Sequence, residues 1–189
     1  MSEPPLVCVA RMASAIRAGR ERLPTQRRQQ RPSVDIRVES PLWHKKRSAK
    51  ALLRQAICQT ACDLGLSRGE VSVVLTDDSA IRTLNRTWRR RDVPTNVLSF
   101  PLDAGGTTGP KPPLLGDIVI AYETTAREAE LERKSFDHHL AHLAVHGFLH
   151  LVGYDHATDH EASAMEQLES LILARLDVPD PHLGIGRGI

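Results

Sequence analysis

The segment FDHHLAHLAVHGFLHLV, residues 136–152, constrains the possible folds of this chain more than any other feature of the sequence. Its apolar positions have helical periodicity and cover almost every side of the helix, apart from a row of histidines at 138, 142, 146 and 150. A helix that is apolar nearly all round lies inside a domain, so other elements must surround it. The sequence therefore predicts a domain built around a central, histidine-bearing helix.

The elements expected around this helix are short strands and amphipathic helices. Four segments have the composition of strands: SVDIRVES (33–40), VSVVL (71–75), NVLSF (96–100) and DIVIA (117–121). Helical periodicity marks residues 45–64, a segment that begins at Asp77 or Asp78, residues 124–134, and a last segment that begins at Asp159. Strands and helices mixed in this order, without regular alternation, predict an α+β fold with a small mixed sheet of about four strands and about five helices.

Two of these helices have a predicted inner face. In the helix after Asp77 it consists of Ile81, Leu84 and Trp88, so Trp88 is expected in the core. The inner face of the last helix is expected to hold Met165, Leu168, Ile172 and Leu176.

The chain of 189 residues, 41% of them hydrophobic, is long enough for one well-buried core, which we place at residues 33–178. Residues 1–32 carry seven arginines and two glutamates without a sustained apolar period, which predicts a flexible basic arm. Residues 179–189 contain two prolines and three glycines and are expected to form an irregular tail. Without the arm, the chain has a small net negative charge, so a nucleic-acid contact in the domain must be local.

Cellular location is predicted from what the sequence lacks. No apolar run approaches the roughly 18 residues of a membrane helix, and the three cysteines are too few and odd in number for a disulfide framework. Both observations favour a cytoplasmic protein. Cys58 and Cys62 are spaced as a possible ligand pair, but reduced thiols without a role are the favoured interpretation.

The motif HGFLHLVGYDH, residues 146–156, has the spacing of a metal site. His146 and His150 lie one helical turn apart on the same face, where both can reach one ion. Gly153 can end the helix in a left-handed conformation and turn the chain so that His156 returns to the pair. Three neutral imidazoles suit zinc, although nickel, copper or iron would accept them. We expect one metal ion, bound by His146, His150 and His156.

Three histidines without a fourth ligand in the motif leave a coordination position open, which is typical of catalytic zinc. Asp155 has two possible roles, accepting a ring N–H from a ligand histidine or capping the turn. His138 and His142 are expected to be buried, hydrogen-bonded histidines, and His160 is a less favoured substitute for His156. The glutamate that serves as general base in H-E-x-x-H metalloproteases is absent, because Gly147 follows the first histidine.

A second cluster lies upstream, in RTLNRTWRRRDVPTNVLSFP, residues 82–101. It places Arg82, Arg86, Arg89, Arg90 and Arg91 around Trp88. Guanidinium groups bind phosphates in a two-pronged geometry, so this cluster is a candidate nucleic-acid contact. A solvated helix end, with arginines near the negative end of the helix dipole, is the alternative.

With these residues in view, the chain resembles the YbeY family, bacterial single-domain metal-dependent endoribonucleases of ribosomal RNA maturation. The motifs HGFLHLVGYDH, DVPTNVLSFP (92–101) and LLGDIVI (114–120) occur in the family's order, and the resemblance covers roughly residues 34–178. It implies an α+β fold with a small sheet, a zinc ion on His146, His150 and His156, and a functional arginine, by position Arg89.

The resemblance also implies a function, namely single-strand-specific cleavage of RNA in the maturation of the 16S ribosomal RNA 3′ end and in ribosome quality control. The implied partners are ribosomal RNA and the small subunit or its assembly proteins, with no role for DNA or a membrane. Our hypothesis assigns catalysis to His146, as a ligand of the ion, and to Arg89, which stabilises the charge of the transition state.

Two alternatives to this function stay open. One is a ribosome-assembly factor with a structural metal, and the other is a metal-dependent hydrolase of a non-RNA substrate. The general base is not identified, and the nucleophile is either water or the RNA 2′-OH.

Overall fold

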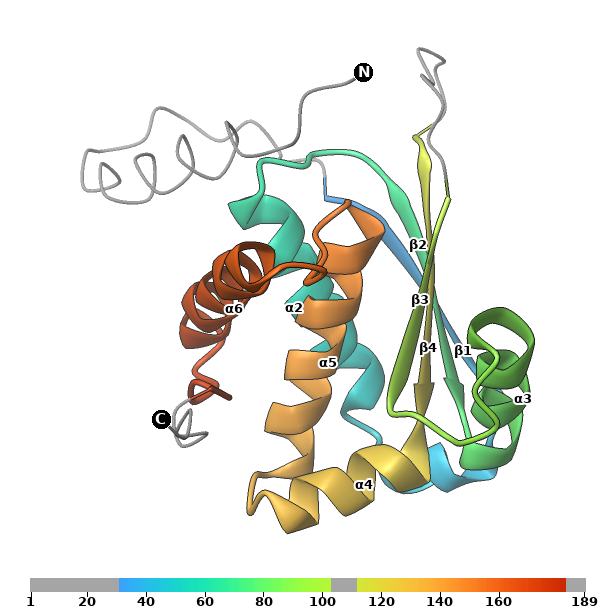
Figure 1. Ribbon diagram of the computed structural model, residues 1–189. Coiled ribbons are helices and arrows are strands. Elements are labelled where there is room, and N and C mark those ends of the chain that lie inside the picture. Colours follow the sequence, from blue (N-terminus) through green and yellow to red (C-terminus); the bar gives the residue numbers. More distant parts are fainter. Residues whose placement is uncertain (1–30, 103–111, 183–189) are drawn as a thin grey trace. The chain divides into compact units, whose positions relative to one another are not determined.

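The computed structural model describes residues 31–102 and 112–182 (Figure 1). The predicted basic arm lies outside the described residues except for its last two, and the predicted tail lies outside them except for residues 179–182. In the described residues no helix is both long enough and apolar enough to cross a membrane.

The sheet is mixed and has four strands. These are β1 (Ser33–Val38), β2 (Glu70–Thr76), β3 (Val97–Pro101) and β4 (Leu114–Ala121), in the spatial order β1-β2-β4-β3. β1, β2 and β4 are parallel, whereas β3 is antiparallel to β4, with Ser99 opposite Ile118. β3 is therefore an edge strand on the side where the candidate site forms.

Five α-helices and one short 3-10 helix belong to the described residues. They are η1 (Pro41–Lys45), α2 (Ala49–Asp63), α3 (Asp78–Arg89), α4 (Tyr122–Leu131), α5 (Phe136–Leu151) and α6 (Asp159–Ala174). The α+β prediction is thus confirmed. The helix predicted at 45–64 begins later than expected, at Ala49, because Lys45 ends a separate turn of 3-10 helix that starts at Pro41. The buried Trp43 of this turn donates its ring N–H to the Thr76 carbonyl oxygen at 2.8 Å.

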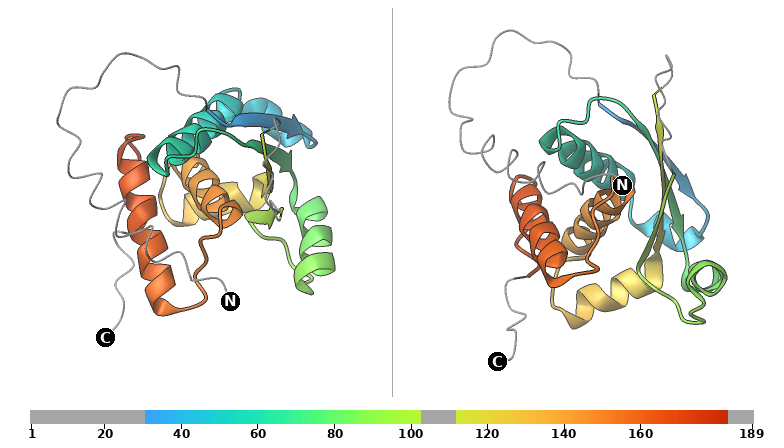
Figure 2. Two further views of the ribbon diagram at one scale, coloured as in Figure 1. Left: turned by 90° about the horizontal axis from the view of Figure 1, so that it is seen from above. Right: turned by 45° about the horizontal axis from the view of Figure 1, so that its top comes forward.

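Helix α5 is central, as its apolar circumference predicts. It packs against the sheet, and α2, α4 and α6 contact its other sides, while α3 covers the opposite face of the sheet (Figures 1 and 2). Ten of its residues are buried, among them Leu140, Val145, Phe148 and Leu149. All four members of the histidine row are half-buried: His138, His142, His146 and His150.

The distance between α5 and the sheet is set by Gly147. A Cβ atom at this position would lie 3.1 Å from Cγ2 of Ile118 and 3.2 Å from Oγ of Ser99. Ser99 also donates its hydroxyl to the Gly147 carbonyl oxygen at 3.1 Å. This close approach brings the histidine face of α5 beside the edge strand β3.

Trp88 does not lie in the core, and this part of the prediction was wrong. Ile81 is fully buried in the cluster with Leu98 and Val119, whereas Trp88, two turns further along α3, is 68% exposed. Its helical phase is as predicted, but α3 has there passed the edge strand. Only Phe100 supports the ring among the aromatic residues described, with 5.8 Å between ring centroids.

Gly116 is expected to tolerate no side chain. It has a φ of +142° in β4, where the pairing with β2 is irregular, and a Cβ there would collide with the Phe100 carbonyl oxygen and lie 2.9 Å from Cδ2 of Leu151. We expect Gly116→Ala to lower the free energy of unfolding by about 3 kcal/mol. The measurement is chemical denaturation.

Gly65→Ala is the matched control for this prediction. Gly65 also has a positive φ, +70°, but a Cβ atom at this position would have no neighbour within 4 Å. Backbone strain alone costs about 1 kcal/mol. Equal losses in the two variants would show that the contact with β3 does not matter.

Candidate metal centre

Three imidazoles converge at the C-terminal end of α5. His146 and His150 come from the last two turns of the helix, and His156 comes from the loop that follows. The Nε2 atoms of His146 and His150 are 3.1 Å apart, and one ligand nitrogen from each of the three rings lies within 4.8 Å of the others. Nitrogen atoms at this separation can all reach a single ion at about 2.0–2.1 Å.

The turn that returns His156 depends on two residues. Gly153 has a φ of +94°, and its N–H donates to the His150 carbonyl oxygen at 3.2 Å, which ends the helix. The Asp155 carboxylate accepts the backbone N–H of His156 at 2.8 Å. Of the two roles considered for Asp155, the structure therefore shows the one in the turn.

Glu169 of α6 is the buried partner of this centre. It is 1% exposed, and its Oε1 lies 2.7 Å from Nδ1 of His146. Its Oε2 lies 3.3 Å from Nε2 of His142 and 2.9 Å from Nε2 of His182. An ionised carboxylate only accepts hydrogen bonds, so three imidazole N–H groups point at one carboxylate.

This contact determines the tautomer of His146. Because Nδ1 must carry the proton that is donated to Glu169, the neutral ring has its lone pair on Nε2, which faces His150. A carboxylate that orients a ligand histidine in this way is the usual outer partner of a metal site. The arrangement prepares His146 to bind a cation through Nε2.

The electrostatics of the centre favour a neutral His150 and an ionised Glu169. Burial lowers the pKa of His150, and the neighbouring His146 and His156 lower it further. Burial alone would raise the pKa of Glu169, but the hydrogen bonds from His142 and His146 outweigh it and hold this pKa far below its usual range. Metal ligation requires these same protonation states.

His142, Glu169 and His182 form a second group whose ligand atoms lie within 4.8 Å of one another. In this group both imidazoles already donate to the carboxylate. For His142 the predicted hydrogen bond is therefore confirmed, but the residue is half-buried and not buried as expected. For His138 the prediction was wrong, because it is half-buried and its ring bonds to no other described residue; the buried histidine is His139, 2.9 Å from Glu128.

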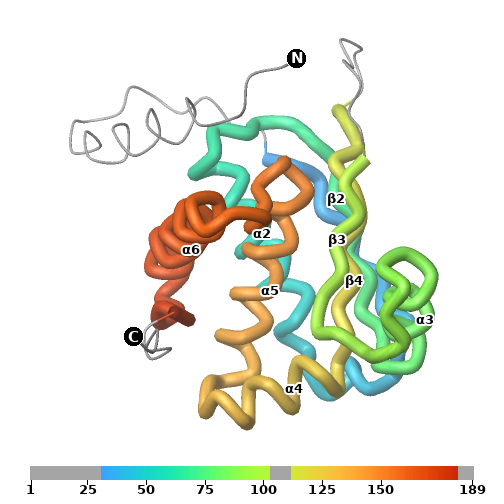
Figure 3. Tube along the Cα trace, viewed as in Figure 1, coloured from blue at the N-terminus to red at the C-terminus, as the bar shows by residue number. Residues whose placement is uncertain are grey.

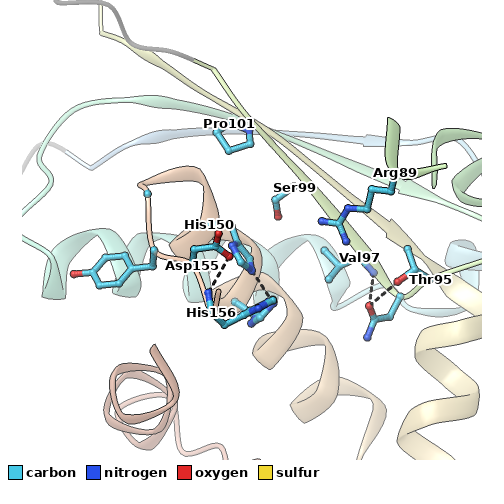
Figure 4. A pocket seen from close by; sticks show the side chains of 12 residues that line it. Arg89, Thr95, Val97, Ser99, Pro101, His150, Asp155 and His156 are labelled. Atoms are coloured by element: carbon cyan, nitrogen blue, oxygen red, sulfur yellow. Dashed lines mark hydrogen bonds between the residues drawn. The ribbon is translucent and has the colours of Figure 1, made fainter. Parts of the chain in front are cut away.

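The three histidines open onto a pocket of about 560 Å³. Its other wall is built from α3 and β3, and the Arg89 side chain extends from α3 on that side of the pocket (Figure 4). The lining residues are Arg89, Thr95, Asn96, Val97, Ser99, Pro101, His146, His150, Gly153, Tyr154, Asp155 and His156. The structure therefore brings Arg89 and the three histidines to one cavity, although 57 residues separate Arg89 from His146.

The arginine cluster divides into two parts. Arg82 forms a two-pronged pair with Asp92, at 2.9 and 3.0 Å, and Arg86 lies 3.9 Å from the same carboxylate. Within the described residues, Arg89, Arg90 and Arg91 have no carboxylate partner. Of these three arginines only Arg89 is among the residues that line the pocket, where it can receive an anion.

The pocket contains little that can act as a general base. Among its lining residues the only carboxylate is Asp155, which already accepts the N–H of His156. Gly147, where a metalloprotease has its glutamate, faces the sheet, and a side chain there would press against Ile118 and Ser99. The arrangement thus supplies cation ligands and a guanidinium group on opposite walls.

Glu169 and His182 were not identified as site residues from the sequence. Glu169 is spaced four residues from Met165 and three from Ile172, so it is a carboxylate on the apolar face of its helix. A charged residue in such a position is almost never fully buried without a partner, and this was a usable signal. For His182 the sequence offers no such signal, because it follows the last helix in an irregular segment.

His160 and the two cysteines do not join the centre. His160 is exposed at the start of α6 and belongs to neither histidine group of the described residues. Cys58 is half-buried and Cys62 is exposed, both on α2. Neither of the two possible metal-binding groups among the described residues contains a cysteine.

Comparison with known proteins agrees with the motifs. The family model described as Endoribonuclease YbeY matches residues 35–177. A protein of Nitrobacter winogradskyi named Endoribonuclease YbeY is 50% identical over 186 residues, which are 95% of this chain and 96% of that protein. Proteins of the same name from Rhodopseudomonas palustris strain BisA53 and Bradyrhizobium diazoefficiens are 54% and 50% identical, over 80% of this chain and 90% and 85% of theirs.

Proposed function

Because the chain belongs to the YbeY family, we propose that it is a metal-dependent endoribonuclease that cleaves single-stranded RNA during ribosomal RNA processing. Its ion, for which zinc suits the ligands best, is held by His146, His150 and His156. The observation that carries the proposal is that these imidazoles line one pocket together with Arg89, which has no carboxylate partner in the part of the chain that the structure describes. Maturation of the 16S RNA 3′ end and a role in ribosome quality control, in the cytoplasm and with small-subunit partners, belong to the same proposal.

The residues of the pocket have distinct tasks in this reaction. When bound, the divalent ion supplies a Lewis acid that polarises a phosphoryl oxygen. Arg89 binds the scissile phosphate and stabilises the additional negative charge of the transition state. Glu169 keeps the proton of His146 on Nδ1, and Gly153 and Asp155 hold His156 in place. The nucleophile is water or the RNA 2′-OH, and products that carry a 5′-phosphate would eliminate the 2′-OH.

Arg89→Ala is the first test of the proposal. We expect the rate of cleavage of a single-stranded ribosomal RNA 3′ segment to fall by about 10²–10³-fold, because a preorganised donor to the transition state is lost. Metal content, measured by elemental analysis, should stay that of the wild type. Arg37→Ala is the matched control, because Arg37 is exposed on β1 at the opposite edge of the sheet.

The same assay separates the alternatives. A wild-type protein that binds metal but cleaves no RNA, single-stranded or duplex, would favour an assembly factor. Full activity of Arg89→Ala on RNA, with an inactive His146→Ala variant, would remove the phosphate-binding role of Arg89.

A further inference from the structure

Trp88 is an aromatic side chain on the surface, beside the pocket, that the proposed reaction leaves without a role. It is 68% exposed, the second tryptophan of a chain that has two, whereas Trp43 is 3% exposed. Phe100 packs against the indole at an interplanar angle of 65°, with 5.8 Å between the ring centroids. One side of the ring is thus held in place while most of its surface faces solvent.

The surroundings of Trp88 are strongly cationic. Arg89, Arg90 and Arg91 follow it directly in the chain and have no carboxylate partner among the described residues. An apolar protein surface would find few matching groups here, because the three guanidinium groups would have to be desolvated or paired. A polyanion with exposed flat apolar faces matches both properties, and single-stranded nucleic acid has this chemistry.

Trp88 and the pocket lie on the two sides of the edge strand β3. Ser99 and Pro101 line the pocket, whereas Phe100, between them, faces α3 and contacts Trp88. Trp88 and Arg89 are consecutive on the last turn of α3, so their side chains diverge by about 100°. Arg89 consequently extends from α3 into the pocket (Figures 3 and 4), whereas Trp88 is not among the residues that line it and contacts β3 through Phe100.

We propose that Trp88 is a stacking platform for an unpaired nucleobase of the RNA strand whose phosphate is bound by Arg89. The inference rests on the proposed function and adds a binding position to it. The strand would cross the edge of β3, with one phosphate in the pocket and a neighbouring base on the indole. Bases within a duplex are already stacked on each other, so this platform selects for single strands.

The first experiment reads the indole directly. In a full-length, metal-loaded Trp43→Phe variant, Trp88 is the single tryptophan of the chain. Stopped-flow mixing with single-stranded oligoribonucleotide is expected to quench its emission before turnover. An oligonucleotide of equal length with abasic residues keeps its phosphates and should leave the emission unchanged. Equal quenching by both probes, or no quenching by either, would overturn the proposal.

The second experiment is kinetic and uses cleavage of a single-stranded substrate. Trp88→Ala is expected to raise KM by roughly 10-fold, in the range of one lost base–aromatic stack, with kcat within a few fold of the wild type. Trp88→Phe, which retains a stacking face, should recover most of this loss. If the Trp88→Ala variant had the KM of the wild type, the stacking role of Trp88 would be overturned, whereas the proposed RNA cleavage would not be affected. Absence of cleavage by the wild type would instead count against the proposed function.

Discussion

Replacement of His150 by alanine is expected to remove metal binding and, with it, RNA cleavage. In the proposed site His150 supplies one of three nitrogen ligands, and its Nε2 lies 3.1 Å from Nε2 of His146. Loss of even an outer partner costs about 10–100-fold in metal affinity, so loss of a ligand should cost more than about 100-fold. Elemental analysis and a competition titration with a chelator measure the affinity, and the ribosomal RNA segment measures the activity.

His160→Ala is the control for this result. His160 is also a histidine of the C-terminal part, but it is exposed at the start of α6 and outside the cluster. Its variant should bind metal and cleave RNA as the wild type does. A His150→Ala protein that is destabilised in thermal unfolding, yet cleaves RNA at the wild-type rate in its folded form, would show that the metal is structural.

The second large effect is expected at Glu169, which acts as a positioning residue. Glu169→Gln keeps the shape of the side chain but removes the charge that receives N–H groups from His142, His146 and His182. Metal affinity should fall by about 10–100-fold, because the tautomer of His146 is no longer fixed. The free energy of unfolding of the metal-free protein should fall by roughly 2–3 kcal/mol, the contribution of a hydrogen bond to a buried charge.

The pH dependence separates this role from simple packing. The pKa of Glu169 is lower in the folded protein than its ordinary value of 4.5, so its contribution to stability is fully present above pH 4.5. This contribution is lost as the pH falls from there towards the folded pKa. The stability difference between wild type and Glu169→Gln should therefore shrink in acid. A difference that stays constant from pH 7 to pH 3 would contradict the role of the charge.

Glu130→Gln serves as the control for both measurements. Glu130 is an exposed glutamate on α4 and belongs to neither of the two histidine groups of the described residues. Its variant should change the free energy of unfolding by less than about 0.5 kcal/mol. Metal affinity should not change.

Local patterns in the sequence were sufficient for much of the fold. The period of the apolar residues in 136–152 predicted α5 within one residue of its observed end, and the Asp159 start of α6 was also correct. His146 and His150 needed no tertiary information, because a spacing of four on a helix always places two side chains on one face. The positive φ of Gly153 could also be predicted from the sequence, because a glycine just after a helix commonly ends it in a left-handed conformation.

Contacts between distant segments were decided by the tertiary structure alone. Glu169 contacts His146, 23 residues away in the sequence, because α6 packs on α5. The periodicity of one helix cannot predict which residue of another helix its buried carboxylate will contact. For Trp88 the helical phase was right and the burial was wrong. Periodicity gives the direction in which a side chain points, whereas its burial depends on how far the neighbouring sheet extends, and the sheet ends at β3 before α3 does. The sequence by itself thus determined the elements and the pair of candidate ligands on α5. Only the packing of the elements decided which groups surround the candidate metal site and which aromatic ring remains exposed beside it.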